Sequence, residues 1–392
     1  MKVKLFIGVV LGVAALALTI GCDDKSEFEW PANTSDAVAN YSMIVEASYA
    51  DSLATAQALN ATLATLVSEP SEASLQAAKN AWIASRPPYL QTEVYRFYDG
   101  PIDNPTDGPE GDLNAWPLDE LYIDYVDGDP ASGSINGTLE LTPESIRALN
   151  GVNGEADVAT GYHAIEFLLW GQDQSDDGPG NRPWSDYLTA EDANGVVPTP
   201  EGTTTQARRG TYLTIAGDLL VEDLQSVHAQ WAPGAAYRTS FEADPQLAFE
   251  KILTGMIVLS GFETGGERLQ AALDSGNQED EHSCFSDNTH VDMQEDVRGI
   301  QNVWLGTYGS VSGPGVKAVV EAVDPELAAR LDAQIAQSLA YAMALQVPFD
   351  LEIKVGSEGN ARVQALIDSL RAQEQVLFEV FDLFGLSVTI PE

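Results

Sequence analysis

The sequence predicts an all-α protein made of antiparallel helix bundles, and three observations support this fold class. Apolar residues recur at helical spacing through most long segments of the 392-residue chain. The two-residue alternation of β-strands is rare, and residues 386–390 form the best short candidate for a strand. Glycine and proline separate the helical segments at residues 233–234, 276, 313–315 and 359. We therefore expect two helical-bundle domains with long irregular connections.

The first bundle is expected over residues 32–200 and opens with two long helices. A stripe of apolar residues predicts one helix through residues 41–67. A second pattern predicts a helix over residues 75–98, interrupted at Pro87 and Pro88 because proline breaks the hydrogen-bond ladder.

Residues 99–142 form a long irregular connection, since they are rich in Gly, Pro, Asp and Asn. A stretch of this length without regular structure is often functional. Residues 142–149 can form a helical turn, in which Pro143 suits the first position. A short helix in residues 161–173 follows, and residues 171–202 are again typical of a loop.

The second bundle is expected over residues 201–392. Its helices are predicted at residues 204–231, 244–274, 293–310, 325–346 and 359–384.

The N-terminus resembles a bacterial lipoprotein signal over residues 1–21. Two lysines precede an apolar stretch, and the small residue Gly21 stands directly before Cys22. Cleavage there would leave Cys22 as the lipidated first residue, followed by a polar tether over residues 22–31. We expect an exported protein, periplasmic or on the outer surface, that meets a membrane through its lipid anchor only. The alternative is an ordinary secretory signal that happens to contain Cys22, and it also exports the protein.

The composition is strongly acidic, which restricts the partners that the protein can bind. The net charge is −41, from 19 basic and 60 acidic residues, and it argues against nucleic acid and anionic lipid as partners. Such a field attracts cations, but acidic residues spread along the whole chain favour a role in solubility. After residue 21 no apolar run reaches the roughly 20 residues needed to span a bilayer. If Cys22 carries lipid, Cys284 has no cysteine left to pair with.

Residues 161–173, GYHAIEFLLWGQD, hold the most informative pattern in the chain. His163 and Glu166 are three residues apart and therefore lie on one helix face. The helix is apolar on nearly all sides, which is typical of a buried helix, and buried polar groups need a partner. The two can form a hydrogen-bonded core pair, join a network, or bind a metal ion as in other helix bundles. The zinc peptidase signatures are absent, because no His-Glu-x-x-His occurs and Phe167 occupies the position of the inverted form's histidine.

Residues 279–296 are the best source of further metal ligands. The candidate side chains there are His282, Cys284, Asp287, His290 and Asp292. A mixed set of histidine and carboxylate ligands suits iron, manganese or zinc better than magnesium. A lone thiol is more often a small buried hydrophobe than a ligand. The alternative interpretation of the whole segment is a solvated acidic loop.

Other candidates are weaker. Glu93 and Arg96 lie three residues apart among aromatic residues, as a surface ion pair or a partly buried one. Residues 173–178 resemble the start of a calcium loop, but Trp184 stands where the twelfth-position Glu is needed, so we interpret them as a solvated loop. His228 lies in an amphipathic helix, where a structural role is expected.

Several segments together resemble the imelysin-like family, whose signature is Gly-x-His-x-x-Glu. Gly161, His163 and Glu166 match that signature, and residues 95–103, 266–273 and 282–290 are similar to the family's iron-regulated periplasmic branch. The resemblance covers about residues 35–385. It implies two all-helical bundle-like domains with the motif near their junction, export, and a role in bacterial iron uptake. It also implies the peptidase activity for which the family is named.

The leading hypothesis is a lipid-anchored exported protein that binds iron or a small iron-bearing ligand for uptake. His163 and Glu166 would be the metal ligands, with Glu93, Asp287 and His290 as further candidates. Iron is the expected metal, zinc is the alternative, and transport components of the outer or inner membrane are the expected protein partners. One rival hypothesis is a metallopeptidase with Glu166 as ligand or base. The other is a non-catalytic interaction lipoprotein in which the His–Glu pair only fixes helix packing.

Overall fold

The computed structural model describes residues 28–175, 178–189 and 205–390. The predicted signal peptide and Cys22 lie outside these residues. The all-α prediction is confirmed, because the strands are only β1 (Thr307–Tyr308) and β2 (Val311–Ser312), a two-residue antiparallel pair within the described ranges.

The strand predicted at residues 386–390 is wrong. These residues form no strand and have no strand partner among the described residues. Leu386, Val388 and Ile390 pack against the core, so the two-residue alternation reflects contact with the helices beneath it.

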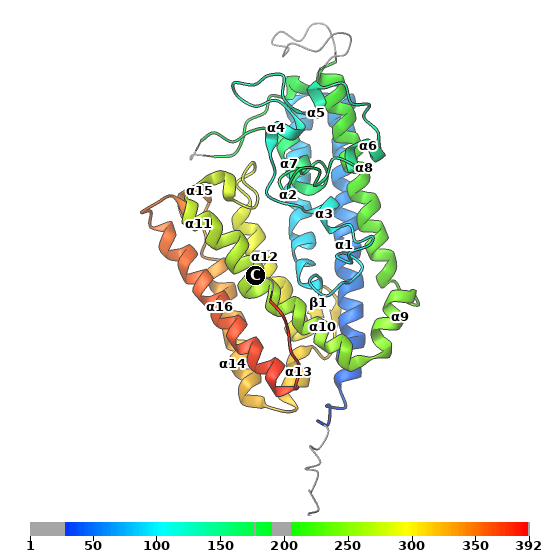
Figure 1. Cartoon of the computed structure of the whole chain (residues 1–392), viewed down its shortest axis with the longest axis vertical. Coiled ribbons are helices and arrows are strands. Elements are labelled where there is room, and N and C mark those ends of the chain that lie inside the picture. The colour runs from blue at the N-terminus through cyan, green and yellow to red at the C-terminus, as the bar shows by residue number, and fades with distance from the viewer. Residues whose placement is uncertain (1–27, 176–177, 190–204, 391–392) are drawn as a thin grey trace, which may run out of the picture.

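The first bundle is built from four helices that run along the long axis of the molecule (Figure 1). They are α1 (Thr34–Ser68), α2 (Glu72–Leu90), α7 (Gly161–Trp170) and α8 (Thr205–Trp231). Helix α1 packs against both α2 and α8, and α7 packs between α2 and α8. The packing therefore places the division between the bundles after α8, whereas the sequence suggested a boundary near residue 200.

The connection between α2 and α7 contains more structure than predicted. It holds η1 (Glu93–Tyr95), α3 (Glu110–Leu113), α4 (Glu120–Ile123), α5 (Gly133–Asn136) and α6 (Pro143–Arg147), and η2 (Trp184–Tyr187) follows α7. Helix α2 ends at Leu90, so Pro87 and Pro88 fall in its last turn instead of interrupting it. Among these short helices, α4, α5 and α6 lie around one end of the first bundle (Figure 1).

The second bundle surrounds the C-terminal helix. Its main helices are α10 (Pro245–Ile257), η3 (Val258–Gln270), α11 (Ala271–Ser275), α12 (Thr289–Leu305), α14 (Pro325–Ala342) and α16 (Gly359–Leu383). Shorter ones are α9 (Ala236–Ala243), η4 (Gln278–Asp280), α13 (Val316–Glu321) and α15 (Asp350–Ile353). Helices α14 and α16 lie side by side on the flank opposite α1 and α8 (Figure 1).

The helix predicted over residues 244–274 is continuous but changes its winding. Its middle part, η3, is a π-helix of 13 residues, and π-helical segments are frequent at functional sites. The segment directs Thr264 and Arg268 at Asp296 of α12, with oxygen–oxygen and nitrogen–oxygen distances of 3.1 Å and 2.9 Å. This places a buried arginine between the bundles.

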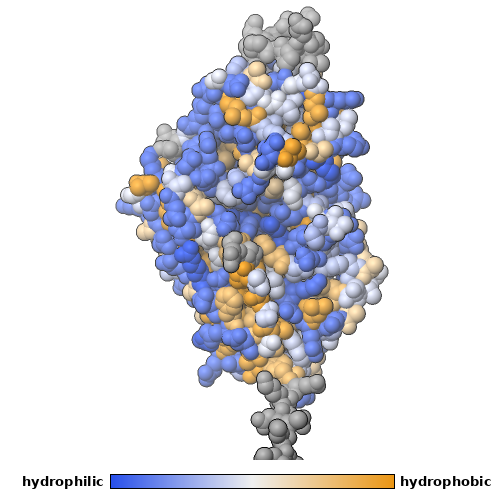
Figure 2. Space-filling model, in the orientation of Figure 1, coloured by the Kyte–Doolittle hydropathy of each residue, from blue (hydrophilic) through white to orange (hydrophobic). Residues whose placement is uncertain are grey.

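The surface carries both hydrophilic and apolar residues on the face that Figure 2 shows. Hydrophilic residues cover most of this face, and apolar residues gather mainly in its lower half. Within the described ranges, no helix combines the length and the apolar character that a membrane crossing requires.

Candidate functional site between the two bundles

Helix α7 begins at Gly161, where the backbone has a conformation that only glycine adopts easily. Gly161 has φ 84°, in the left-handed region. A Cβ atom at this position would lie 2.4 Å from the carbonyl oxygen of Leu113 in α3. Helix α3 thus packs directly on the start of α7, and every residue of α7 is buried.

His163 and Glu166 form a buried pair on α7. Nδ1 of His163 lies 3.0 Å from Oε2 of Glu166, and neither side chain is more than 1% exposed. Oε1 of Glu166 accepts hydrogen bonds from the backbone N–H and the hydroxyl of Ser286, at 3.0 Å and 2.7 Å. Burial raises the pKa of Glu166 to about 8 and lowers the pKa of His163 well below its ordinary value. At pH 7 His163 is therefore neutral, and Glu166 is mostly protonated.

A second histidine, His282, lies against His163. The two ring centroids are 4.7 Å apart, and the ring planes are inclined at 76°. Nδ1 of His282 lies 2.7 Å from Oδ2 of Asp292, which also accepts a hydrogen bond from the Ser283 hydroxyl at 2.5 Å. Burial lowers the pKa of His282 to about 4. Both imidazoles are thus in the neutral form that binds metal ions.

Asp292 keeps its charge because Arg86 of α2 lies beside it. Nη2 of Arg86 is 3.5 Å from Oδ2 of Asp292, and both side chains are fully buried. Nη1 of Arg86 donates to Oδ1 of Asn114 at 2.7 Å, and the guanidinium lies 4.8 Å from the ring centroid of Tyr162. Burial alone would raise the pKa of Asp292, but the Arg86 charge and the hydrogen bond from His282 hold it well below its usual range.

The site joins the two bundles. His163 and Glu166 belong to α7 of the first bundle, whereas His282 and Ser286 belong to the segment that leads into α12 of the second. Each imidazole is hydrogen-bonded through Nδ1 to a carboxyl group, which is how proteins orient histidine ligands of metals.

The chemistry of the site depends on Nε2 of His163. This atom is buried and has no hydrogen-bond partner within the described residues, which is costly unless a ligand uses it. Nε2 carries a free electron pair when Nδ1 holds the ring proton and donates it to the ionised Glu166 carboxylate, so a metal that binds to Nε2 displaces the proton that Glu166 holds at pH 7. Both oxygens of Glu166 are occupied by hydrogen bonds, so this residue orients His163. The site can supply imidazole nitrogens, and a bound metal would complete its coordination with water or with its own ligands.

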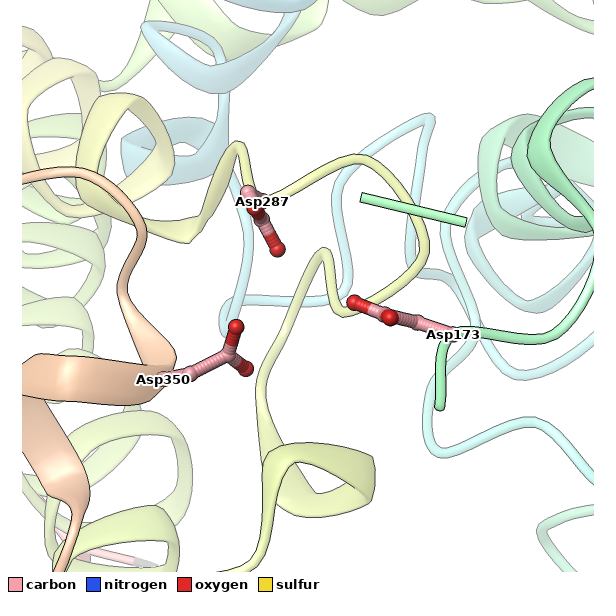
Figure 3. A group of neighbouring side chains, drawn as sticks. All are labelled: Asp173, Asp287 and Asp350. Atoms are coloured by element: carbon pink, nitrogen blue, oxygen red, sulfur yellow. The ribbon is translucent and has the colours of Figure 1, made fainter. Parts of the chain in front are cut away.

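The predicted partner Asp287 lies in another group. Among the described residues, three aspartates, Asp173, Asp287 and Asp350, bring one carboxylate oxygen each within 4.8 Å of the others. Figure 3 shows their carboxylates directed toward one another. His290 contacts this segment through Nδ1, which lies 3.2 Å from the carbonyl oxygen of Asp287. The structure thus brings neither Asp287 nor His290 into contact with the His163–Glu166 pair.

Glu93 is placed in a neighbouring layer of ion pairs. Its Oε2 lies 2.7 Å from Nη1 of Arg96 and 2.5 Å from Nη2 of Arg268. Burial would raise the pKa of Glu93, but the two arginines lower it to about 2. Arg268 also pairs with Asp296, which follows Asp292 by one turn of α12. Glu93 and Arg96 form the partly buried pair that the sequence offered as one alternative, and the hydrogen bonds of Glu93 among the described residues go to arginines instead of His163.

The remaining sequence candidates have structural surroundings. Cys284 is a buried free thiol in the main core. Nε2 of His228 lies 3.3 Å from Oε1 of Glu46 on the partly exposed face of α8. Asp173, expected in a solvated loop, is only 6% exposed.

The sequence analysis missed Ser286 and Arg86, and it ranked His282 and Asp292 below Asp287 and His290. The segment 279–296 contains the residues that contact α7, but its composition gave no sign of which side chains face that helix. One signal was available for Arg86: it precedes Pro87 in an amphipathic helix, where a charged residue on the apolar face needs a partner.

Comparisons with known proteins place this geometry in context. A family model described as Imelysin matches residues 45–377. The chain is 24% identical over 323 residues to "Iron-regulated protein A" of Synechococcus elongatus, an alignment that covers 79% of this chain and 75% of that protein. A solved structure described as an iron-regulated protein A precursor from Parabacteroides distasonis has a TM-score of 0.69 at 18% identity, over 91% of this chain and 97% of that chain. The last likeness establishes the fold.

Proposed function

The chain belongs to the imelysin family, and from that premise we propose that it binds iron, or a small iron-bearing ligand, as part of bacterial iron uptake. The binding site in this proposal is His163, oriented by Glu166, together with His282. The observation that carries the proposal is the buried Nε2 of His163, which has no hydrogen-bond partner within the described residues.

The protonation states support metal binding at this pair. Burial keeps both histidines neutral at pH 7, so no proton has to leave an imidazolium before a metal binds. Imidazole nitrogen is a suitable ligand for iron and for zinc. Asp292 and Glu166 supply the carboxyl groups that orient the two rings.

The relatives connect the proposal with iron. The Synechococcus protein and the Parabacteroides structure both carry the description iron-regulated protein A. A protein of this family whose site offers neutral imidazoles at a bundle junction fits a role in holding iron or an iron compound. The metallopeptidase alternative needs Glu166 as a free base or ligand, whereas both of its oxygens are engaged in hydrogen bonds here.

Export and lipid anchoring complete the proposal. Residues 1–21 resemble a lipoprotein signal that is cleaved directly before Cys22, and the Parabacteroides structure is described as a precursor. Mass spectrometry of the mature N-terminus tests this part: a diacylglyceryl group on Cys22 supports the anchor, and an unmodified N-terminus elsewhere contradicts it.

The iron site is tested by calorimetric titration of chelator-treated protein. Ferrous ammonium sulfate without oxygen and ferric citrate serve as two separate probes. We expect saturable binding of at least one probe by the wild type and at least tenfold weaker binding by His163→Gln, since that variant removes the unpartnered nitrogen. His228→Gln is the matched control, because it removes a histidine from outside the site, and it should bind as the wild type does.

Equal binding by the wild type and His163→Gln would contradict the proposed site, as would no binding of either probe by the wild type. Circular dichroism must show that the variant is folded before the titrations are compared.

A further inference from the structure

Three aspartates from distant parts of the chain meet, and one of them, Asp287, belongs to the segment that carries His282 and Ser286. Asp173 follows α7, Asp287 precedes α12, and Asp350 is the first residue of α15. One carboxylate oxygen from each lies within 4.8 Å of the others, and Figure 3 shows all three side chains pointing into the same space. The three are 6%, 3% and 4% exposed. This differs from the solvated acidic side chains that the composition suggests.

Asp287 is the strongest indication of a missing partner. Both of its carboxylate oxygens are buried, and no hydrogen-bond donor reaches either one within the described residues. The side chain is directed at Asp173 and Asp350 (Figure 3). A buried carboxylate that faces two others is costly unless it is neutralised or binds a cation.

The electrostatics of the group agree with this. Burial, followed by the charges of Asp350 and Asp173, raises the pKa of Asp287 to about 7. A fourth acid, Glu281, lies close by, and burial together with Asp350 and Asp287 raises its pKa well above the ordinary value. The largest charge effects on both residues therefore come from neighbouring carboxylates.

We propose that Asp173, Asp287 and Asp350 form a binding site for one calcium ion. The donor set consists of carboxylate oxygens, which hard cations prefer. Oxygens on opposite sides of a calcium ion are up to about 4.8–5.2 Å apart, since calcium–oxygen distances are about 2.4–2.6 Å. Calcium also accepts the irregular arrangement that side chains from two loops and a short helix provide, whereas magnesium demands near-ideal octahedral geometry.

The proposed ion would link the two bundles. Asp173 extends from the loop after α7, and Asp350 belongs to the second bundle. Asp287 is next to Ser286, which hydrogen-bonds Glu166, so the ion would also hold the segment that completes the histidine site. Asp173 lines a surface cleft of about 410 Å³ at the C-terminal end of α7, which gives a cation access.

Calcium titration of chelator-treated full-length protein tests the site. We expect one calcium ion per chain by calorimetry, tighter binding of calcium than of magnesium or manganese, and a higher thermal unfolding midpoint when calcium is added. Asp287→Asn should weaken calcium binding at least tenfold. The same variant should unfold at a higher temperature than the wild type without calcium, because it removes one of the mutually repelling carboxylates. Loss of binding combined with a stabler apo protein distinguishes a lost ligand from a damaged fold.

Asp218→Asn is the matched control, since it neutralises an exposed aspartate on α8 that accepts one hydrogen bond from Asn60. It should bind calcium as the wild type does, and so should His163→Gln, which keeps this test separate from that of the iron site. Absence of calcium binding at millimolar concentration, unchanged binding by Asp287→Asn, or tighter binding of magnesium or manganese would overturn the calcium assignment.

Discussion

The neutral state of His282 should make the stability of the protein depend on pH in a calculable way. Burial lowers the pKa of His282 from 6.5 to about 4. Between these values the unfolded chain binds a proton at His282 that the folded chain does not, so the free energy of unfolding rises with pH. A separation of roughly two to three pH units, at about 1.4 kcal/mol each, corresponds to about 3 kcal/mol. This contribution is complete above about pH 6.5 and is lost as the pH falls to about 4.

The substitution His282→Gln isolates this contribution, because glutamine cannot titrate but can still donate to Asp292. We expect the loss of unfolding free energy between pH 7 and pH 4 to be about 3 kcal/mol smaller in the variant than in the wild type, measured by urea denaturation at each pH. The lowered pKa of Asp292 keeps its own titration below this window. His228→Gln controls for the substitution itself. Equal losses in the wild type and His282→Gln would refute the conclusion that burial keeps His282 neutral.

Three further substitutions test other parts of the site. Gly161→Ala should destabilise the protein by at least about 2 kcal/mol, because the backbone at Gly161 is left-handed and the carbonyl of Leu113 is close. Gly154→Ala is the control, since Gly154 has open space around it, and it should leave the midpoint of urea denaturation unchanged. Equal urea midpoints for Gly161→Ala and the wild type would contradict this prediction. Arg268→Met should cost about 3–5 kcal/mol because it leaves two buried carboxylates without their arginine, whereas Arg330→Met breaks an exposed pair and should not move the midpoint. For Glu166→Gln, the free energy of unfolding should rise relative to that of the wild type as the pH rises from 6 to 9. The wild-type carboxyl has a pKa of about 8 in the folded state, so the wild type loses stability when this group ionises. A constant difference in free energy of unfolding between the two proteins would show that the pKa of Glu166 is not raised.

The fold class follows from local information, and the arrangement of the bundles does not. Helical periodicity located the long helices, because an apolar stripe is a property of neighbouring residues. The π-helical turn of η3 and the placement of α8 in the first bundle depend on contacts with helices far away in the sequence. The alternation in residues 386–390 wrongly suggested a strand, because alternate side chains of this segment pack on the helical core without a partner strand.

Only the part of the candidate site that lies within one helix could be predicted from the sequence, because only that part depends on local spacing. His163 and Glu166 lie on one helix, so their three-residue spacing was enough to bring them together. Their partner Ser286 is 120 residues beyond Glu166, and the direction of each side chain in that segment depends on its turns. Asp287 has φ 57°, in the left-handed region. The backbone therefore turns there, so that Ser286 faces α7 while the side chain of Asp287 faces the other two aspartates. Such a change of direction is invisible in composition and spacing.

The central claim is that iron binds through the histidines between the two bundles. X-ray absorption at the iron edge of the iron-loaded, calcium-saturated protein tests it most directly, because imidazole ligands give a characteristic scattering pattern. The account predicts imidazole nitrogen in the iron coordination shell of the wild type and its loss in His163→Gln. A shell of oxygen ligands alone, unchanged by that substitution, would contradict it.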